Sequence, residues 1–295
     1  MSESIQSLLD NKHCKIISTC RLQIFNGVRF RGLPFFKYCE CNLNSSELCL
    51  TSEERSNLAL KYFEGKAGEV SAFLEEHEFF PLLCALFQKN NRGDIKSFFK
   101  EPYNFYKGEI NDLSASHCEQ DKFKVCALVL CVIFNNRFKE EYLTTKNEEI
   151  QQIIENTLSQ CKLNKYSSFR NLDEALSTLT GNLVMKVDKV YRAIHDKLYD
   201  FLADYSWRKM SKFIIEYAQC DFISDRFLWK ADNNGTEDIA YTICITNEQI
   251  EIYIKRILRD WSEGEVRAVF KNRNMKSPSF NDKLINHLSR RDHSY

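Results

Sequence analysis

The stretch TGNLVMKVDKVYRAIHD, residues 180–196, decides which fold the sequence predicts. Thr180-Gly181-Asn182 is a turn sequence between two extended runs, and Val187 to Ile194 alternates β-branched and aromatic residues with polar ones. This pattern predicts a β-hairpin. Helical patterning resumes directly afterwards, from His195 to Tyr205. A single hairpin set among helices is typical of a winged-helix domain.

Helical patterns dominate the sequence before this hairpin. Asp121–Phe134 and Glu140–Asn156 predict two long helices, and Asp173–Leu179 predicts a shorter one. The longest apolar run, Val125 to Phe134 (VCALVLCVIF), has about half the length that a bilayer span requires. We therefore expect a buried helix there and no membrane-spanning segment.

Two local signals mark helix starts further upstream. Thr51-x-x-Glu54 has the form of a capping box that opens a helix over Ser52–Phe63. Pro81 stands at the start of the apolar segment Pro81-Leu82-Leu83-Cys84, where the first turn of a helix tolerates proline. The expected fold is therefore mainly α, with a minor β part.

Extended segments are expected near both ends of the chain. Lys15–Arg21 (KIISTCR) is an apolar, β-rich run stopped by charge, as in an inner strand of a parallel sheet. Its neighbouring strands are missing from the sequence, so we expect it to be the residual edge of a nucleotide-binding core. Tyr241–Ile245 is a second extended run, followed by a helix over Asn247–Ser262.

The composition excludes several classes of protein. Lys and Arg total 41, as do Asp and Glu, so no net charge favours nucleic acid or anionic lipid. No basic segment followed by an apolar block indicates a signal peptide. The 12 cysteines form no C-x2-C pair, so we expect reduced thiols in a cytoplasmic protein and no metal site.

Three residues are candidates for binding a nucleotide. Arg21 ends its strand and could project a guanidinium toward a terminal phosphate. Pro81 offers a flat ring to a purine, and His195 lies near a helix N-terminus, where anions are favoured. Each residue also has a structural interpretation: a solvent-facing arginine, a helix start and a packed histidine.

The order of these motifs resembles the STAND NTPases, and most closely the novel-STAND group. A strand ending in Thr-x-Arg comes first, then an apolar helix opened by proline, then a winged-helix pattern closing on Ile194-His195-Asp196. The resemblance runs from about Lys15 to Tyr205. It implies that Arg21 senses the γ-phosphate, that Pro81 in the helical lid stacks on adenine, and that His195 reads the β-phosphate of ADP.

One essential part of such an NTPase is missing from the sequence. No G-x-x-x-x-G-K-[ST] loop occurs, and Gly65-Lys66-Ala67 lacks both the leading glycine and the hydroxyl. We therefore expect no catalysis by this chain and no ATP or ADP binding unless an upstream core is supplied. Met1 falls within the helix predicted before the sensor strand, so a partial gene product is favoured over a truncated paralogue.

The expected organisation has four parts: a residual core edge (1–45), a helical lid (46–110), a winged-helix domain (111–210) and a mainly helical C-terminal region (211–295). The expected function is the regulatory portion of a nucleotide-dependent signalling switch, with protein partners. A winged-helix nucleic-acid binder is the alternative, but Asp173–Leu179 (DEALSTL) is acidic where such proteins carry Lys and Arg. A hydrolase using the adjacent His117 and Cys118 lacks nucleophile–base geometry.

Overall fold

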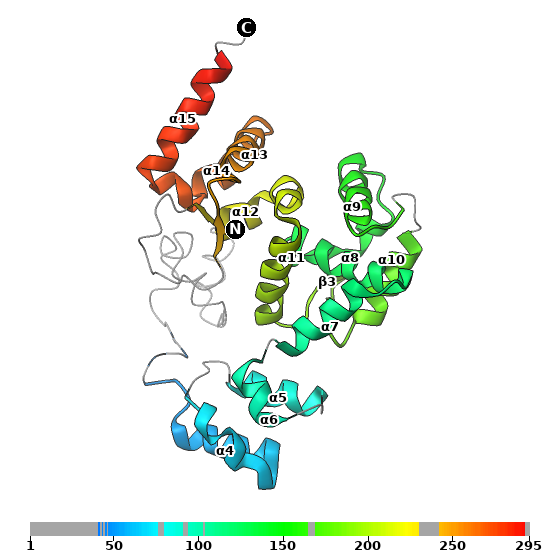
Figure 1. Cartoon of the computed structure of the whole chain (residues 1–295), viewed down its shortest axis with the longest axis vertical. Helices are drawn as coiled ribbons and strands as arrows, with labels where there is room; N and C mark the ends of the chain where they lie inside the picture. Colours follow the sequence, from blue (N-terminus) through cyan, green and yellow to red (C-terminus); the bar gives the residue numbers. More distant parts are fainter. Residues whose placement is uncertain are drawn as a thin grey trace, which may run out of the picture. The chain divides into compact units, whose positions relative to one another are not determined.

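The computed structural model describes residues 41, 43, 45, 47–75, 80–90, 94–102, 104–164, 169–229 and 242–292 (Figure 1). Over these residues the fold is mainly α-helical with a minor β part, which confirms the expected class. The chain divides into two compact units, residues 1–102 and 103–295, which are described separately. The strand predicted at Lys15–Arg21 lies outside the described residues.

The first unit consists of short helices around an aromatic core. Thr51 and Glu54 form the predicted capping box: the Thr51 Oγ1 accepts from the Glu54 amide at 3.2 Å, and Glu54 accepts from the Thr51 amide at 2.8 Å. The Phe63 and Phe80 rings lie 5.6 and 5.5 Å from the buried Phe99 ring. The elements are α4 (Ser52–Phe63), the 3-10 helix η2 (Glu64–Phe73), α5 (Phe80–Asn90) and α6 (Ile95–Lys100).

The second unit begins with helices packed around a buried central helix, α8. Cys126 to Phe134 are all buried, as the apolar run predicted, and α8 contacts α7, α9, α10 and α11. No helix among the described residues is long and apolar enough to cross a membrane. The elements are α7 (Asn104–Ala115), α8 (Glu119–Ile133), β1 (Phe138–Lys139), η3 (Glu140–Leu143), α9 (Glu148–Gln160), α10 (Phe169–Leu179), β2 (Val184–Val187), β3 (Val190–Ala193) and α11 (Asp196–Tyr217).

The predicted hairpin exists, but its turn lies elsewhere. Strands β2 and β3 pair antiparallel, with Val187 opposite Val190, so the turn is Asp188-Lys189. Both residues have positive φ (51° and 61°), which suits the twist of a two-residue hairpin. Thr180-Gly181-Asn182 instead joins α10 to β2, and its glycine, with φ of 88°, ends the helix. The predicted position of the turn was wrong because Asp188 and Lys189 adopt positive φ without a glycine.

A third strand completes this sheet in the order β1-β3-β2. β1 was not expected: its two residues lie in the short gap between the helices predicted over Asp121–Phe134 and Glu140–Asn156. The second of these predicted helices is interrupted: η3 ends at Leu143, and Asn147 then caps α9 by accepting from the Ile150 amide at 3.1 Å. A side-chain cap inside a helical pattern starts a new helix.

The C-terminal part of the second unit packs helices on a two-stranded parallel sheet. β4 pairs with β5, and β4 had no counterpart in the sequence analysis. Helix α11 departs from helical geometry at Met210 (φ −148°, ψ 49°). The elements are α12 (Cys220–Arg226), β4 (Phe227–Trp229), β5 (Ile243–Ile245), α13 (Ile250–Ser262), α14 (Val266–Lys271), η4 (Arg273–Lys276) and α15 (Pro278–Asp292).

A buried arginine joins α13 to the end of α11. Arg256 donates to Asp260 at 2.6 Å and to the carbonyl oxygens of Ile215, Glu216 and Ala218 at 2.8, 2.7 and 2.7 Å. Both charged side chains are less than 10% exposed. These carbonyls lie at the C-terminal end of α11, where carbonyl oxygens have no amide donor within the helix. Arg256 thus supplies the C-terminal cap of a neighbouring helix.

Candidate functional site

The three residues proposed for nucleotide binding belong to different parts of the chain. Arg21 lies outside the described residues. Pro81 is half-buried in the first turn of α5, in the first unit. His195 belongs to the second unit, at the junction of β3 and α11.

His195 is the residue that caps α11. Its backbone is extended (φ −151°, ψ 158°), and its Nδ1 accepts a hydrogen bond from the Leu198 amide at 2.9 Å. The Nε2 lies 3.5 Å from the hydroxyl of Tyr106 on α7, at the long limit of a hydrogen bond. The Tyr106 and His195 rings meet edge to face with centroids 6.0 Å apart. Histidine here performs the capping role of serine or asparagine.

The capping bond fixes the protonation state of His195. An Nδ1 that accepts a hydrogen bond carries no proton, so the neutral ring is protonated at Nε2. Burial lowers the pKa of His195 from 6.5 to about 4, opposed by the charge of Asp196. The Nε2–H is therefore the single donor of this ring, and among the described residues its contact is the long one with Tyr106. A phosphate oxygen could accept from it, which fits the role that the family resemblance gives to this histidine.

The depressed pKa of His195 predicts loss of stability in acid. The folded state favours the neutral ring. The stabilisation by neutral His195 is therefore complete above pH 6.5 and is lost as the pH falls toward about 4. We expect the free energy of unfolding, measured by urea titration at several pH values, to fall by roughly 1–3 kcal/mol over this interval from His195 alone. His195→Asn should keep the cap and remove this part of the pH dependence. An unchanged pH profile in the variant would contradict the assignment.

The exposed face of α10 does not suit nucleic acid. In a winged-helix DNA binder the helix before the hairpin carries cationic side chains into the major groove. On α10 the exposed Arg170 pairs with Glu174 at 3.1 Å, and Asp173 adds another acid. The net charge of this helix is therefore negative, from one arginine and two acids.

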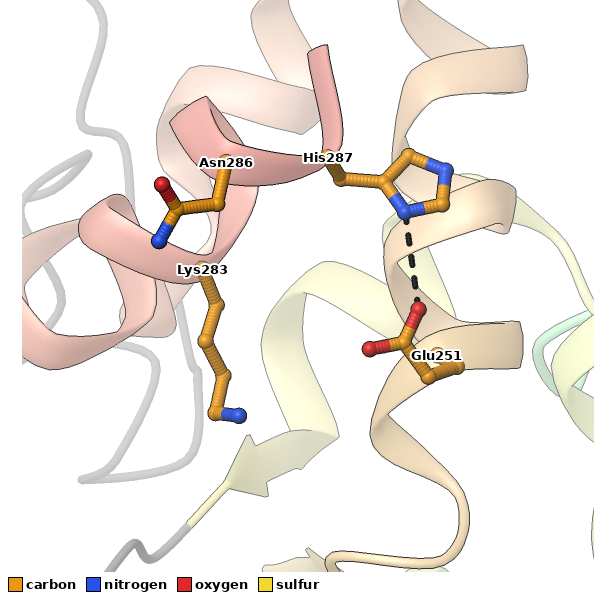
Figure 2. Close-up of a pocket in the computed structure, with 4 residues that line it drawn as sticks. All are labelled: Glu251, Lys283, Asn286 and His287. Carbon is orange, nitrogen blue, oxygen red and sulfur yellow. Dashed lines mark ion pairs between the residues drawn. The ribbon is translucent and has the colours of Figure 1, made fainter. Parts of the chain in front are cut away.

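A small polar cavity lies between α13 and α15 (Figure 2). Its volume is about 100 Å³, and Glu251, Lys283, Asn286 and His287 line it. His287 and Glu251 point toward one another, with 3.5 Å between Nδ1 and Oε2. Lys283 lies over the Trp229 ring at 5.4 Å. These contacts hold α15 against its neighbours, and the cavity has room for little more than solvent.

Among the described residues we find no cluster that could bind a metal ion, and the buried thiols discussed below are not reactive. Nowhere in them do three or more His, Cys, Asp or Glu side chains gather so as to hold a metal ion. Cys84, Cys126 and Cys131 are buried, which confirms that part of the cysteines serve as small core residues. Burial raises the pKa of the Cys84 and Cys131 thiols to about 12, so neither is a nucleophile at neutral pH.

Comparison with known proteins yields no relative: no family model, no curated protein and no solved structure matches the chain. The resemblance to STAND proteins consequently depends on this chain's own residues and on their order.

Proposed function

We propose that this chain is the regulatory, protein-interacting portion of a STAND-type nucleotide switch, and that it is not an enzyme by itself. The observation that carries the proposal is the position of Ile194-His195-Asp196, where β3 ends and α11 begins. His195 caps the helix there and keeps an Nε2–H donor beside a helix N-terminus, an arrangement that favours an anion.

The order of elements supports a winged-helix assignment for residues 111–210. A helix, a short strand, two helices and a hairpin follow one another as α8, β1, α9, α10, β2 and β3, with the first strand on the outer side of β3. Because α10 is acidic, we assign this domain to contacts within a switch and with protein partners. A cytoplasmic location and an ATP or ADP site completed by an upstream core belong to the same proposal.

The transcript sequence immediately upstream of Met1 tests this function. An in-frame Gly-rich loop ending in Lys-Ser or Lys-Thr would supply the missing phosphate site. In that longer protein, His195→Asn should speed the release of ADP while the melting temperature stays unchanged, since asparagine retains the cap. An upstream sequence without such a loop, or ADP release unaffected by the variant, would count against the proposal.

The chain alone is expected to bind neither ATP nor ADP. Without the phosphate loop, His195 offers a single neutral donor, which cannot replace the backbone amides and lysine of a complete site. Isothermal titration of the 295-residue chain should show no binding tighter than about 100 μM for either nucleotide. A micromolar dissociation constant would mean that these residues form a nucleotide site of their own.

A further inference from the structure

We propose that a groove between α11 and α13 binds an acidic, apolar segment of a protein partner. This inference concerns contacts within the second unit and does not depend on the nucleotide switch. Either proposal can fail without the other.

The groove combines an apolar floor with a cationic rim. Its volume is about 400 Å³, within the range of ligand sites. The half-buried Ile252 supplies the accessible apolar surface, Ile215 lines the groove but is fully buried, and Lys255 and Arg259 are exposed. The remaining lining residues are Glu216, Arg256 and Ser262. Helices α11 and α13 are in contact, so packing within one unit fixes the two walls.

Hydrogen bonds hold the rim arginine in position. The Nη2 of Arg259 donates to the carbonyl oxygen of Glu216 at the end of α11. The neighbouring Arg256 is fixed by its bonds to Asp260 and to three carbonyl oxygens of the same helix end. An arginine held by one nitrogen still presents its other N–H groups, and a carboxylate that binds them costs less ordering of the side chain.

The rim cations have no carboxylate partner within the described part of the chain. Lys255 and Arg259 take part in no ion pair there, whereas Arg256 is matched by Asp260 at 2.6 Å. Glu216 is the one acid that lines the groove, and its charge raises the pKa of the neighbouring Tyr217 after the larger effect of burial. The groove thus carries the two cations of its rim against one lining acid, Glu216, which leaves an excess of positive charge beside Ile252.

The charges of Lys255 and Arg259 indicate which kind of ligand the groove binds. Two cations about one helical turn apart fit a segment with two acidic side chains at similar spacing. The half-buried Ile252 offers apolar surface to an aliphatic side chain between them. A free phosphate would bind the cations but leave Ile252 uncovered. We therefore assign the groove to a protein segment that carries Asp or Glu beside Leu, Ile or Val.

Fluorescence anisotropy with two labelled peptides tests the assignment. The first is a short peptide of leucine and glutamate at helical spacing, and the second has glutamine in place of every glutamate. The full chain is expected to bind the acidic peptide and not the neutral one. Lys255→Glu should weaken binding about tenfold, since it turns an attraction into a repulsion. Ile252→Ser should weaken it as well, through loss of apolar contact.

Lys107→Glu provides the matched control, because it changes the net charge equally on the exposed surface of α7. It should leave binding unchanged, and circular dichroism should show that all three variants melt like the parent chain. Equal binding of both peptides, no binding of either, or equal loss in the Lys107 variant would overturn the proposal. So would displacement of the peptide by millimolar inorganic phosphate in the Ile252→Ser variant and the parent alike, which would indicate a site for small anions only.

Discussion

Replacement of Arg256 by methionine is expected to lower the free energy of unfolding by about 3–5 kcal/mol, because it breaks a buried ion pair on one side. Asp260 would keep a charge in a site where it is only 5% exposed. Three carbonyl oxygens at the end of α11, those of Ile215, Glu216 and Ala218, would lose their donor. Urea unfolding followed by tryptophan fluorescence measures the loss.

A double variant tests whether the broken Arg256–Asp260 pair causes this loss of stability. Burial raises the pKa of Asp260 while Arg256 lowers it, so without the arginine the carboxyl should be protonated more readily. Arg256→Met combined with Asp260→Asn should therefore be less destabilised than the two separate effects added together. A simple sum would show that the two side chains act independently.

A surface pair with the same spacing serves as the control. Arg208 and Asp204 are also an arginine and an aspartate four residues apart on one helix, 2.8 Å from each other, but 75% and 52% exposed. Arg208→Met should cost less than about 0.5 kcal/mol. If both methionine variants lose the same small amount, the Arg256 bonds contribute little and the argument from burial is wrong.

Local signals in the sequence predicted those helices whose start or burial is determined by residues close in sequence. The Thr51–Glu54 capping box fixes the start of α4, and the apolar run of α8 requires burial on all sides. Both were confirmed because their cause lies within a few residues of the chain. The existence of the β2–β3 hairpin was predicted for the same reason, from its alternating residues.

Features that depend on distant residues escaped prediction. β1 and β4 are short strands that exist only through pairing with β3 and β5, and no pattern of two or three residues reveals this. Arg256 was equally hidden: its helical spacing gives no sign that it would be buried to cap another helix. Such roles follow from tertiary contacts, which local propensity does not encode.

The candidate site shows the same limit. His195 was expected near a helix N-terminus, and the structure puts it at the N-cap of α11. What the sequence did not reveal is that its Nδ1 would bind the Leu198 amide, or that Tyr106, 89 residues away, would face the Nε2. Whether Pro81 and Arg21 ever meet this histidine remains a prediction of the family resemblance.

Replacement of Asn274 by alanine is expected to lower the free energy of unfolding by about 2–4 kcal/mol, because this side chain pairs with β4 as a third strand would. Its Oδ1 accepts from the Trp229 amide at 2.7 Å, and its Nδ2 donates to the Phe227 carbonyl at 3.0 Å and to the Tyr253 hydroxyl at 2.9 Å. All of these groups are buried, so alanine would leave the Trp229 amide and the Phe227 carbonyl without this partner and without water. The Tyr253 hydroxyl would still accept from the Asn272 side chain at 2.7 Å.

Two further substitutions separate lost hydrogen bonds from lost volume. Asn274→Asp keeps the size and the acceptor but removes the donor and adds a buried charge, so it should destabilise at least as much as alanine. Asn286→Ala, at an exposed position on α15, should change stability by less than about 0.5 kcal/mol. Hydrogen exchange of the Trp229 amide provides the direct readout, since Asn274→Ala removes its acceptor and should speed exchange at that amide. Unchanged exchange would mean that β4 is protected by other contacts, and that Asn274 does not complete the sheet.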